Sequence, residues 1–398
     1  MLKKTKFIHI YEFYLATLFV YTNGSWLYFA VDKIILLGLQ LLSIVFYIFL
    51  QHSKGEKIRS PNGLALFFIL MPFFSKIINL NINSSLVNTF SSAAVYLSLS
   101  CLSYQKLDVL LDRYARVIFF LCLVTLVIAP ITLVNYSLLS TFPISTSGFD
   151  IDGYGFYNLI IYTDRVSNDF RAQSIFWEPG AWSFSLSFAF YWLVIEKRQY
   201  KKIPYFLFGV LLASSTTGFF LLMLILIHIL LNNNDKKVKK TMITYLSFSV
   251  LLVTSGIIYL QTSTNIDVGE LIYDQTLGKL MGTSEASALS LTDRVASTQK
   301  AFNIAIDNPF FGVGKLGAED SLFVTSSIAE ISYQLGLIFL LVYLFVFRQV
   351  FKKLGIIISC VFMIVLLNGE AISYFILCSL ILIYGTKKIM IKKREIIL

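Results

Sequence analysis

The sequence predicts an all-α, polytopic integral membrane protein with about 12 transmembrane helices. The first reason is composition: 57% of the residues are hydrophobic, 16% are aromatic and only 14% are charged, with a mean hydropathy of +0.74. Such a chain has too little polar surface to fold as a soluble globule. The second reason is that apolar stretches long enough to cross a bilayer alternate with clusters of lysine and arginine, as they do in multi-pass proteins.

Charge and cysteine usage exclude two other classes. A formal net charge of +10 is common in nucleic-acid-binding proteins, but here the basic residues concentrate in loops between apolar stretches, where the positive-inside rule explains them. We therefore expect no nucleic-acid partner. The four cysteines, Cys101, Cys122, Cys360 and Cys378, lie inside apolar stretches without CxxC spacing or neighbouring histidines. We predict no zinc site and no disulfide, and we expect no metal and no cofactor.

The first five spans are expected at residues 8–30, 34–50, 64–80, 86–103 and 115–137. Every second loop beside them is basic, which predicts that it is cytoplasmic. These basic clusters are Lys3, Lys4 and Lys6, then Lys54, Lys57 and Arg59, then Lys106, Arg113 and Arg116. Because the basic start runs directly into an apolar stretch without a small-residue cleavage site, we expect the first span to stay in the mature chain.

Two later apolar stretches, from Lys202 to Asn232 and from Leu354 to Thr386, each join two basic segments. A single span in either place would put one basic segment outside, against the positive-inside rule. We therefore predict two hairpins of short helices. The breaks are expected at Ser214–Gly218 and at Asn368–Glu370, where polar side chains and glycine satisfy a turn at membrane depth.

Spans near residues 174–195, 241–260 and 322–347 complete the prediction, with both termini in the cytoplasm. This topology leaves two large outer loops, residues 138–173 and 261–321. Neither loop has the composition or length of an independent domain, so we predict a single integral membrane domain over residues 1–398.

The basic residues outside the predicted cytoplasmic segments are Lys33, Lys76, Arg165, Arg171, Lys279, Arg294, Lys300 and Lys315. The arginines among them are the first candidates for substrate binding, because a guanidinium group binds phosphate oxygens in pairs and stays charged at physiological pH. For Arg171 the alternatives are an interfacial position and an ion pair with Asp169.

The segment around Glu178 predicts the start of the sixth helix. Pro179 favours the first helical position and disfavours helical geometry at the residue before it. Free amides at such a start bind anions, and Arg171 on the preceding segment is placed to bind the same anion. Because a carboxylate facing lipid is costly, Glu178 needs a cavity, the interface or a partner, and an ion pair with an arginine is the alternative to acid-base chemistry.

In the second outer loop, the capping-box spacing of Ser290-Leu-Thr-Asp293 predicts a surface helix over residues 291–306, with Val295, Phe302 and Ile306 on one face. Arg294 then lies in the first helical turn. A cation is unfavourable there by dipole, so ligand contact explains this arginine better than helix stability does.

The residues after this helix predict a turn. Asn308-Pro309 ends the helix, and Phe310-Phe-Gly-Val-Gly314 provides glycines that allow close approach of a ligand or of another segment. Lys300 and Lys315 flank this region and add positive potential.

Together these segments resemble the Wzy-type O-antigen and capsular polysaccharide polymerases, within a superfamily that also contains the O-antigen ligases. The likeness covers most of the chain in topology. At residue level it rests on four segments in order: Arg171–Gly180, Ser214–Gly218, Arg294–Gly314 and Ser326–Leu337, the last ending in Gln-Leu-Gly-Leu. Each pattern is degenerate, so their order carries the resemblance.

The resemblance implies a metal-independent glycosyltransferase of the bacterial inner (cytoplasmic) membrane, with its active site facing outward. Its donor and acceptor would both be undecaprenyl-diphosphate-linked oligosaccharides of lipopolysaccharide or capsule biosynthesis. Family arginines in the outer loops bind the diphosphate and the glycan, and the matching positions here are Arg171, Arg294 and, less closely, Arg165. A chain-length co-polymerase is a further partner that the family implies.

The choice between the polymerase and ligase branches of the superfamily depends on whether the chain has a histidine at one position. Ligases of the superfamily carry a histidine where this chain has Thr325, and all three histidines of the chain, His9, His52 and His228, lie on or near the predicted cytoplasmic side. The polymerase branch is therefore favoured over the ligase branch. Without an outer imidazole, the proton acceptor is expected to be a carboxylate. Glu178 and Glu330 are the candidates, with an ion pair to arginine as the alternative for each, and Asp164 and Asp169 are alternatives in the loop.

Two tryptophans are candidates for sugar contact. Trp177 and Trp182 lie close to the predicted start of the sixth helix, where an indole stacks on a sugar or joins the interfacial aromatic belt. The competing function is a flippase or other transporter of lipid-linked oligosaccharides, which would place its charges along a central pathway. The concentration of outer arginines in two loops favours an enzyme over a transporter, and a non-catalytic scaffold is a third possibility.

Overall fold

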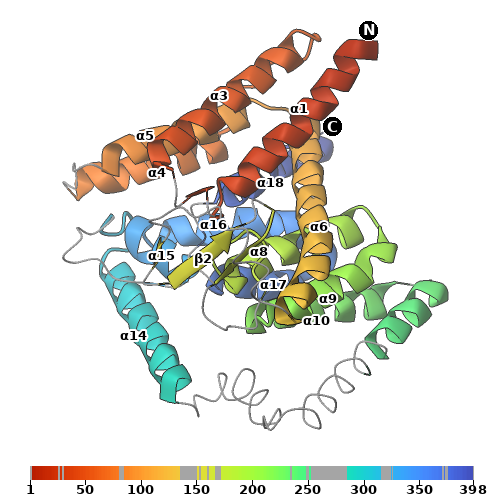
Figure 1. Cartoon of the computed structure of the whole chain (residues 1–398). Helices are drawn as coiled ribbons and strands as arrows, with labels where there is room; N and C mark the ends of the chain where they lie inside the picture. The colour runs from red at the N-terminus through yellow and green to blue at the C-terminus, as the bar shows by residue number, and fades with distance from the viewer. Residues whose placement is uncertain are drawn as a thin grey trace.

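The computed structural model describes residues 2–25, 27–28, 31–79, 85–134, 150–151, 154–158, 161–165, 172–233, 235–247, 251, 285–314, 324, 326–369, 372 and 375–397. This part of the chain is helical except for one small sheet (Figure 1). Its N-terminal half contributes α1 (Leu2–Tyr21), α3 (Lys33–His52), α4 (Gly63–Ile78), α5 (Ser85–Ser100) and α6 (Tyr104–Val134).

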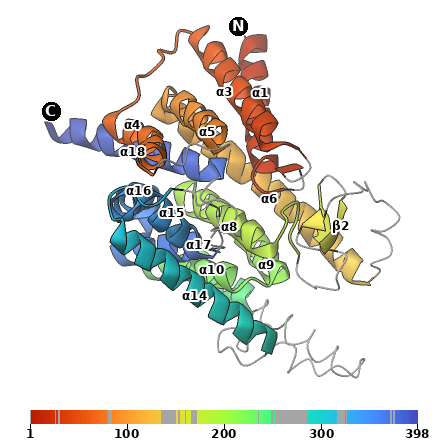
Figure 2. The ribbon, with the colours of Figure 1, turned by 90° about the vertical axis from the view of Figure 1, so that its left-hand side faces the viewer.

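The C-terminal half contributes α8 (Pro179–Phe190), α9 (Ile203–Ala213), α10 (Thr216–Asn232), α14 (Glu285–Asp307), α15 (Ser327–Leu335), α16 (Leu337–Phe351), α17 (Ile356–Asn368) and α18 (Ile376–Ile397). A π-helical turn, Tyr191–Glu196, continues α8. In Figures 1 and 2, α1, α3, α4 and α5 lie on one side of the molecule and α8, α9, α10 and α14 on the other, while α6 runs past both groups.

Helix α8 is the centre of the core. All of its side chains from Ala181 to Phe190 are buried, as expected for a helix without a polar face. It packs against α6, α9 and α10. The helices around it expose large apolar side chains, among them Leu42, Phe49, Phe120 and Leu341, which is the distribution expected where the outer surface faces lipid.

The small sheet departs from the all-α prediction for the first outer loop. Strands β1 (Asp150–Ile151), β2 (Tyr154–Asn158) and β3 (Thr163–Arg165) pair antiparallel in that order, with Phe156 opposite Arg165. The aromatic-rich sequence Tyr-Gly-Phe-Tyr-Asn of β2 favours a strand. A strand this short carries too little periodicity to stand out in a sequence of apolar helices.

Membrane-spanning helices are identified by length and hydropathy. Among the described residues, Lys33–His52 and Tyr104–Ile131 are long and apolar enough to cross a bilayer alone, and Gly63–Ile78, Thr216–Asn232 and Ile356–Asn368 are shorter apolar helices. Several expected spans are thus shorter or interrupted. The first ends at Tyr21 instead of residue 30, before Asn23-Gly24, where Gly24 has φ +81°.

Both predicted breaks are confirmed. Helix α9 ends at Ala213, Ser214 takes a left-handed conformation with φ 45°, and Ser215 caps α10 by accepting a hydrogen bond from Gly218 N (3.4 Å). The second break separates α17, which ends at Asn368, from α18, which begins at Ile376. In both places polar residues interrupt an otherwise continuous apolar stretch.

The single span expected over residues 322–347 is wrong. Gly336, with φ +88°, separates α15 from α16. A side chain at this position would lie 2.7 Å from Pro309 O, so the break depends on a close approach of the chain near Pro309. Sequence periodicity did not reveal it, because a lone glycine inside an apolar helix is often tolerated.

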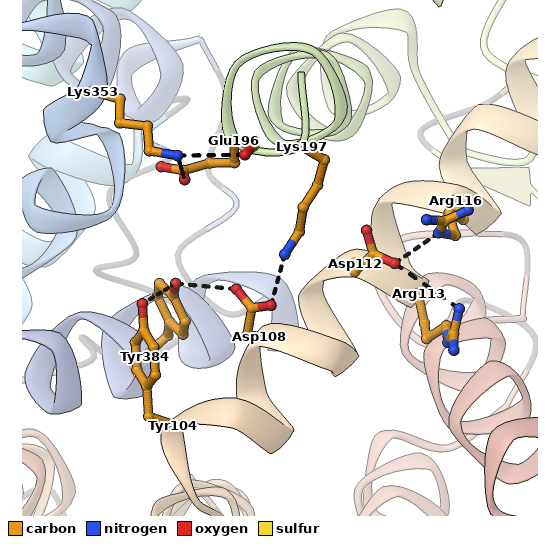
Figure 3. A network of polar contacts seen from close by, with 9 residues as sticks. All are labelled: Tyr104, Asp108, Asp112, Arg113, Arg116, Glu196, Lys197, Lys353 and Tyr384. Carbon is orange, nitrogen blue, oxygen red and sulfur yellow. Dashed lines mark hydrogen bonds and ion pairs between the residues drawn. The ribbon is translucent and has the colours of Figure 1, made fainter. Parts of the chain in front are cut away.

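One end of the molecule gathers ion pairs, and we refer to it as the ion-pair end. Lys106 Nζ lies 3.5 Å from Glu56 Oε1, Lys197 Nζ lies 2.7 Å from Asp108 Oδ2, and Lys353 Nζ lies 2.5 Å from Glu196 Oε2. Figure 3 shows how the second and third of these pairs join α6, the end of the π-helical turn and the turn after α16. All of these segments belong to loops that the positive-inside rule predicts to be cytoplasmic.

Tyrosines extend the same network. Tyr384 on α18 contacts Tyr104 on α6, with their hydroxyl oxygens 2.5 Å apart, and donates to Asp108 Oδ1 (3.3 Å) (Figure 3). Tyr191 donates to Glu196 Oε1 (2.6 Å). Charged groups that the sequence distributes over four separate loops therefore meet at one end, in contacts that satisfy one another.

Candidate functional site

The opposite end of the molecule gathers the helix breaks, and we refer to it as the break end. Ala129 near the end of α6 packs there with Tyr162 and Ala172. Asp108, in the ion-pair end, precedes Ala129 on the same helix by about 30 Å at 1.5 Å per residue, which is close to the thickness of a bilayer's hydrocarbon core. The candidate site residues are concentrated at the break end.

The segment before α8 is fixed by backbone contacts. Ala172 N donates to Leu212 O (2.9 Å), just before the α9–α10 break, and Trp177 N donates to Gly24 O (3.1 Å). Phe176 also forms an isolated bridge with Ser25. Within this segment Ser174 has φ +55°, an uncommon conformation for a residue with a side chain, of the kind that concentrates at functional sites.

The predicted helix start at Glu178 is confirmed. Glu178 is the N-cap of α8, Pro179 occupies the first helical position, and the Glu178 side chain makes no capping hydrogen bond. Its side chain is half-buried. The Glu178 carboxylate therefore lies at the start of α8 without capping the free amides of the helix. We expected Glu178 to act together with Arg171, which lies outside the described residues.

Buried polar atoms accumulate on and before α8. Gln173 Nε2, Ser174 Oγ, Trp182 Nε1, Ser183 Oγ and Ser187 Oγ are buried, and none has a hydrogen-bond partner among the described residues. Buried polar groups are nearly always paired in proteins. These five atoms give the stretch from Gln173 to Ser187 a capacity for polar contacts, and Gln51 and Arg113 at the ion-pair end also have such atoms.

The tryptophans differ in placement. Trp182 is fully buried and packs against Phe176, with ring centroids 5.8 Å apart. An indole without an exposed face has no surface for a sugar, so the structure places Trp182 in the core and not at a binding surface. Trp177 is partly buried and meets Phe375 edge-on, with ring centroids 5.8 Å apart.

The turn after the second-loop helix docks onto another break. Val313 N donates to Tyr333 O (2.8 Å), Gly314 N donates to Gln334 O (3.0 Å) and Ile338 N donates to Pro309 O (3.1 Å). The close approach predicted for the turn is thus confirmed, and the partner is the α15–α16 break. Gly312, with φ +61°, fits only without a side chain, because a Cβ would lie 2.5 Å from Tyr333 O.

The helix predicted over residues 291–306 is confirmed as α14, which begins earlier, at Glu285, and ends at Asp307, directly before Asn308-Pro309. Its buried face matches the prediction at Phe302, which is partly buried and packs against the same cluster as Ala301, but not at Val295 and Ile306. Val295 and Ile306 are 57% and 63% exposed, whereas Ala301 and Ala305 are fully buried. Alanines let α14 approach α15 closely, with Ala301 packing in a cluster with Ala329 and Tyr333.

Arg294 and Lys300 both belong to α14, which runs beside α15 in Figures 1 and 2. Arg294 precedes the packed Ala301 by about two helical turns, and its side chain lies outside the described residues. Lys300 is exposed. The backbone position of Arg294 therefore depends on two contacts of α14: the turn that follows the helix, which docks onto α15, and the buried alanines Ala301 and Ala305.

The start of α15 forms hydrogen bonds with the end of α17 and with the segment before α18. Ser326 Oγ donates to Asn368 Oδ1 (2.6 Å), and Ile372 N donates to Ser327 Oγ (2.7 Å). Asn368 is the residue at which the second hairpin was predicted to break. The polar residues of that break thus position α15 in addition to ending α17.

Helix α15 carries Glu330 into a cavity of about 280 Å³ between α4, α5, α15 and α16. Lys76 of α4 lines the same cavity and is buried, with 9% of its surface exposed. Gln334 Nε2 lies 3.4 Å from Glu330 Oε1. A carboxylate and an ammonium in one small cavity provide a proton acceptor and a group that stabilises developing negative charge.

The structure therefore brings some predicted residues together and separates others. Glu330 lines the cavity and Glu178 does not. Arg165 belongs to β3, where only the backbone is described, and Arg171 and Lys315 lie outside the described residues. Lys76 was not predicted as a site residue. Its signal was a lysine inside the expected span at 64–80, a position where ionisable residues usually serve function.

Among the described residues, no three of His, Cys, Asp and Glu gather closely enough to hold a metal ion. A search of curated proteins and a search of solved structures each found no significant match. Residues 204–333 match the protein-family model Wzy_C, described as O-antigen ligase. This region includes the α9–α10 break, α14, the docked turn and Glu330. The match places this region of the chain in the Wzy/O-antigen ligase superfamily.

Proposed function

We propose that this protein is a polysaccharide polymerase, a glycosyltransferase that joins undecaprenyl-diphosphate-linked repeat units into O-antigen or capsule chains. The observation that carries the proposal is the cavity shared by Glu330 and Lys76, beside the docked turn after α14. Membership of the superfamily supports a membrane enzyme that acts on lipid-linked polysaccharide.

In the proposed reaction, Glu330 accepts a proton from a hydroxyl group of the acceptor sugar. The hydroxyl oxygen forms a bond to the anomeric carbon of the donor, and the bond between that carbon and the diphosphate oxygen breaks. Lys76, Arg171 and Arg294 stabilise the negative charge that develops on the leaving diphosphate. Three cations from the chain provide this stabilisation without a metal ion. Glu178 is the alternative proton acceptor.

The product distinguishes the polymerase from the ligase. Polymerisation moves the growing glycan onto the non-reducing end of one lipid-linked repeat unit, whereas ligation moves it onto a different acceptor lipid. Thr325, which stands where the ligases carry histidine, favours polymerisation. The description of the matched family model favours the ligase as second candidate.

The proposal includes the predicted topology. The chain would form one integral domain of the inner membrane with about 12 spans, both termini cytoplasmic and the break end facing outward. The ion-pair end supports this orientation, because the basic loops assigned to the cytoplasm meet there. The loops at 138–173 and 261–321 would then face outward, and a chain-length co-polymerase is a proposed partner.

Deletion in the producing bacterium tests the function directly. Electrophoresis of the surface glycan should show single capped repeat units, because export and ligation continue without polymerisation. Accumulated lipid-linked polymer would identify a ligase instead, and a complete loss of exported repeats would identify a flippase.

Complementation with Arg171→Ala or Arg294→Ala tests the assigned cations. Each variant should insert stably and make no polymer, since loss of one charge-stabilising donor costs about a hundredfold to a thousandfold in rate. Gln299→Ala, an exposed position on α14, serves as control and should restore normal polymer length. Near-normal polymer in both arginine variants would refute their assignment.

A further inference from the structure

A second cavity lies at the ion-pair end, away from the candidate site. Its volume is about 440 Å³, and it lies between the α3–α4 connection, the α5–α6 connection and α18. Arg59 and Ser60 line it from the first connection, Ser103 and Gln105 from the second, and Lys387 from α18. These three segments are distant in sequence and meet around this space.

Neither cation of this cavity, Arg59 or Lys387, has an ion-pair partner in the part of the chain that the structure describes. Lys106, Lys197 and Lys353 each pair with a carboxylate at 3.5 Å or less. Two carboxylates at the same end of the molecule, Glu56 and Asp108, are already paired with lysines.

The charges of Lys387 and Arg59 interact. Burial lowers the pKa of Lys387, and the positive charge of Arg59 lowers it further. Residue 387 follows the expected end of the last span at Thr386, so this ammonium group lies at the membrane surface. Two like charges held close together repel each other unless an anion lies between them.

Helix starts add to the positive potential. Helix α4 begins at the cavity wall, where the N-cap Asn62 uses its Oδ1 to accept from Ala65 N (2.8 Å) and keeps Nδ2 as a donor. Helix α6 begins directly after Ser103. The N-terminus of a helix favours negative charge, and here two helix starts and the cations Arg59 and Lys387 border one space.

We propose that this cavity binds a phosphate group, supplied by the headgroup of an anionic phospholipid or by a free phosphate. Cations, amide donors and hydroxyl groups around one space match a ligand with several acceptor oxygens. Met390 and Ile391 give the wall an apolar side and are partly exposed, which suits a lipid chain. A bound headgroup would fix the end of α18 against both connections.

The test uses the full-length protein purified in detergent and titrated separately with phosphatidylglycerol, phosphatidylcholine and inorganic phosphate. Native mass spectrometry and the shift in melting temperature report binding. The double variant Arg59→Gln/Lys387→Gln should bind about thirtyfold more weakly, from two lost charges near a membrane surface. Lys392→Gln, an exposed charge on the same helix, should bind as the wild type does, and so should Lys387→Arg.

The ligands separate the two sources. A loss seen with phosphatidylglycerol alone identifies a lipid headgroup, and the same loss with inorganic phosphate identifies a free anion. Equal binding by wild type and double variant for every ligand would overturn the proposal. If the double variant does not purify, Arg59→Gln alone, at an exposed position, should show about a fivefold loss.

Discussion

The two ends of this molecule differ in their described ion pairs, although both have buried polar atoms without a partner among the described residues, such as Gln51 Nε2 and Arg113 Nε at the ion-pair end. At the ion-pair end, Lys106, Lys197 and Lys353 each meet a carboxylate from another segment. At the break end, buried polar atoms such as Gln173 Nε2 and Ser183 Oγ have no partner among the described residues. The left-handed residues Ser174 and Ser214 lie at the break end, and Arg198 has a similar conformation at the ion-pair end.

This difference separates structural charge from candidate chemistry. Pairs that satisfy each other hold loops together and need no ligand. What distinguishes the break end is a cavity shared by the carboxylate of Glu330 and the ammonium group of Lys76, because ionisable side chains inside an apolar region usually serve function. On this comparison we place the reaction at the break end and assign the ion-pair end to assembly and anchoring.

The largest expected effect comes from the cavity acid. Glu330→Gln keeps the shape of the side chain and removes the proton acceptor, so turnover should fall by about a hundredfold to ten-thousandfold. The purified enzyme with a lipid-linked repeat unit as substrate gives the rate, and the melting temperature reports the fold. Lys76→Gln should also lower turnover, and Lys76→Arg should restore part of it.

A carboxylate at the other end provides the matched control. Glu56→Gln removes an acid that pairs with Lys106 at 3.5 Å and should leave turnover unchanged. If Glu330→Gln and Glu56→Gln retain the same turnover, the cavity is not the reaction centre, and Glu178 becomes the acid to test.

A smaller effect, on stability, should separate crowded from open glycines. Gly312→Ala would place a Cβ 2.5 Å from Tyr333 O at φ +61°, and it should lower the free energy of unfolding by about 2 to 5 kcal/mol. Gly55→Ala has a similar φ of +84° with no atom within 4 Å and should cost about 1 kcal/mol. Thermal unfolding in detergent measures both. Equal losses would mean that the turn docks loosely onto α15.

The smallest effect is expected at the ion-pair end. Lys353→Ala removes a partner whose side chain is 46% exposed, so stability should fall by about 0.2 to 1 kcal/mol and by less in high salt. Polymer length should not change. Lys201→Ala, an exposed lysine, is the control, and thermal unfolding at two salt concentrations makes the comparison. A loss of polymer in Lys353→Ala would contradict the division between the two ends.

Much of the local structure was predictable, because it depends on residues near in sequence. Pro179 set the start of α8, Ser215 set the α9–α10 break, and Asn308-Pro309 ended α14. Each signal acts within a few residues through a fixed φ, a cap or a missing amide hydrogen. The Gly336 break was not predictable, because its cause is the approach of Pro309 from a different part of the chain.

The site was predictable only where its signal is local in the sequence. Glu330 was a candidate because it is an acid in an apolar helix, but its neighbour Lys76 is far away in sequence and entered only through the shared cavity. The predicted apolar face of α14 was wrong at Val295 and Ile306, because packing selected small residues such as Ala301. Trp182 was a candidate from position alone, and packing placed it in the core.

The sequence by itself determined the class of protein, the alternation of basic and apolar segments, and the residues able to interrupt helices, since these follow from composition and local propensity. Only the tertiary structure decided which interruptions meet. It joined the turn at Gly312 to α15, Ser326 to Asn368, and Lys76 to the cavity of Glu330. Contacts between distant segments depend on the shape of every packed surface between them, and periodicity in one segment carries no information about that shape.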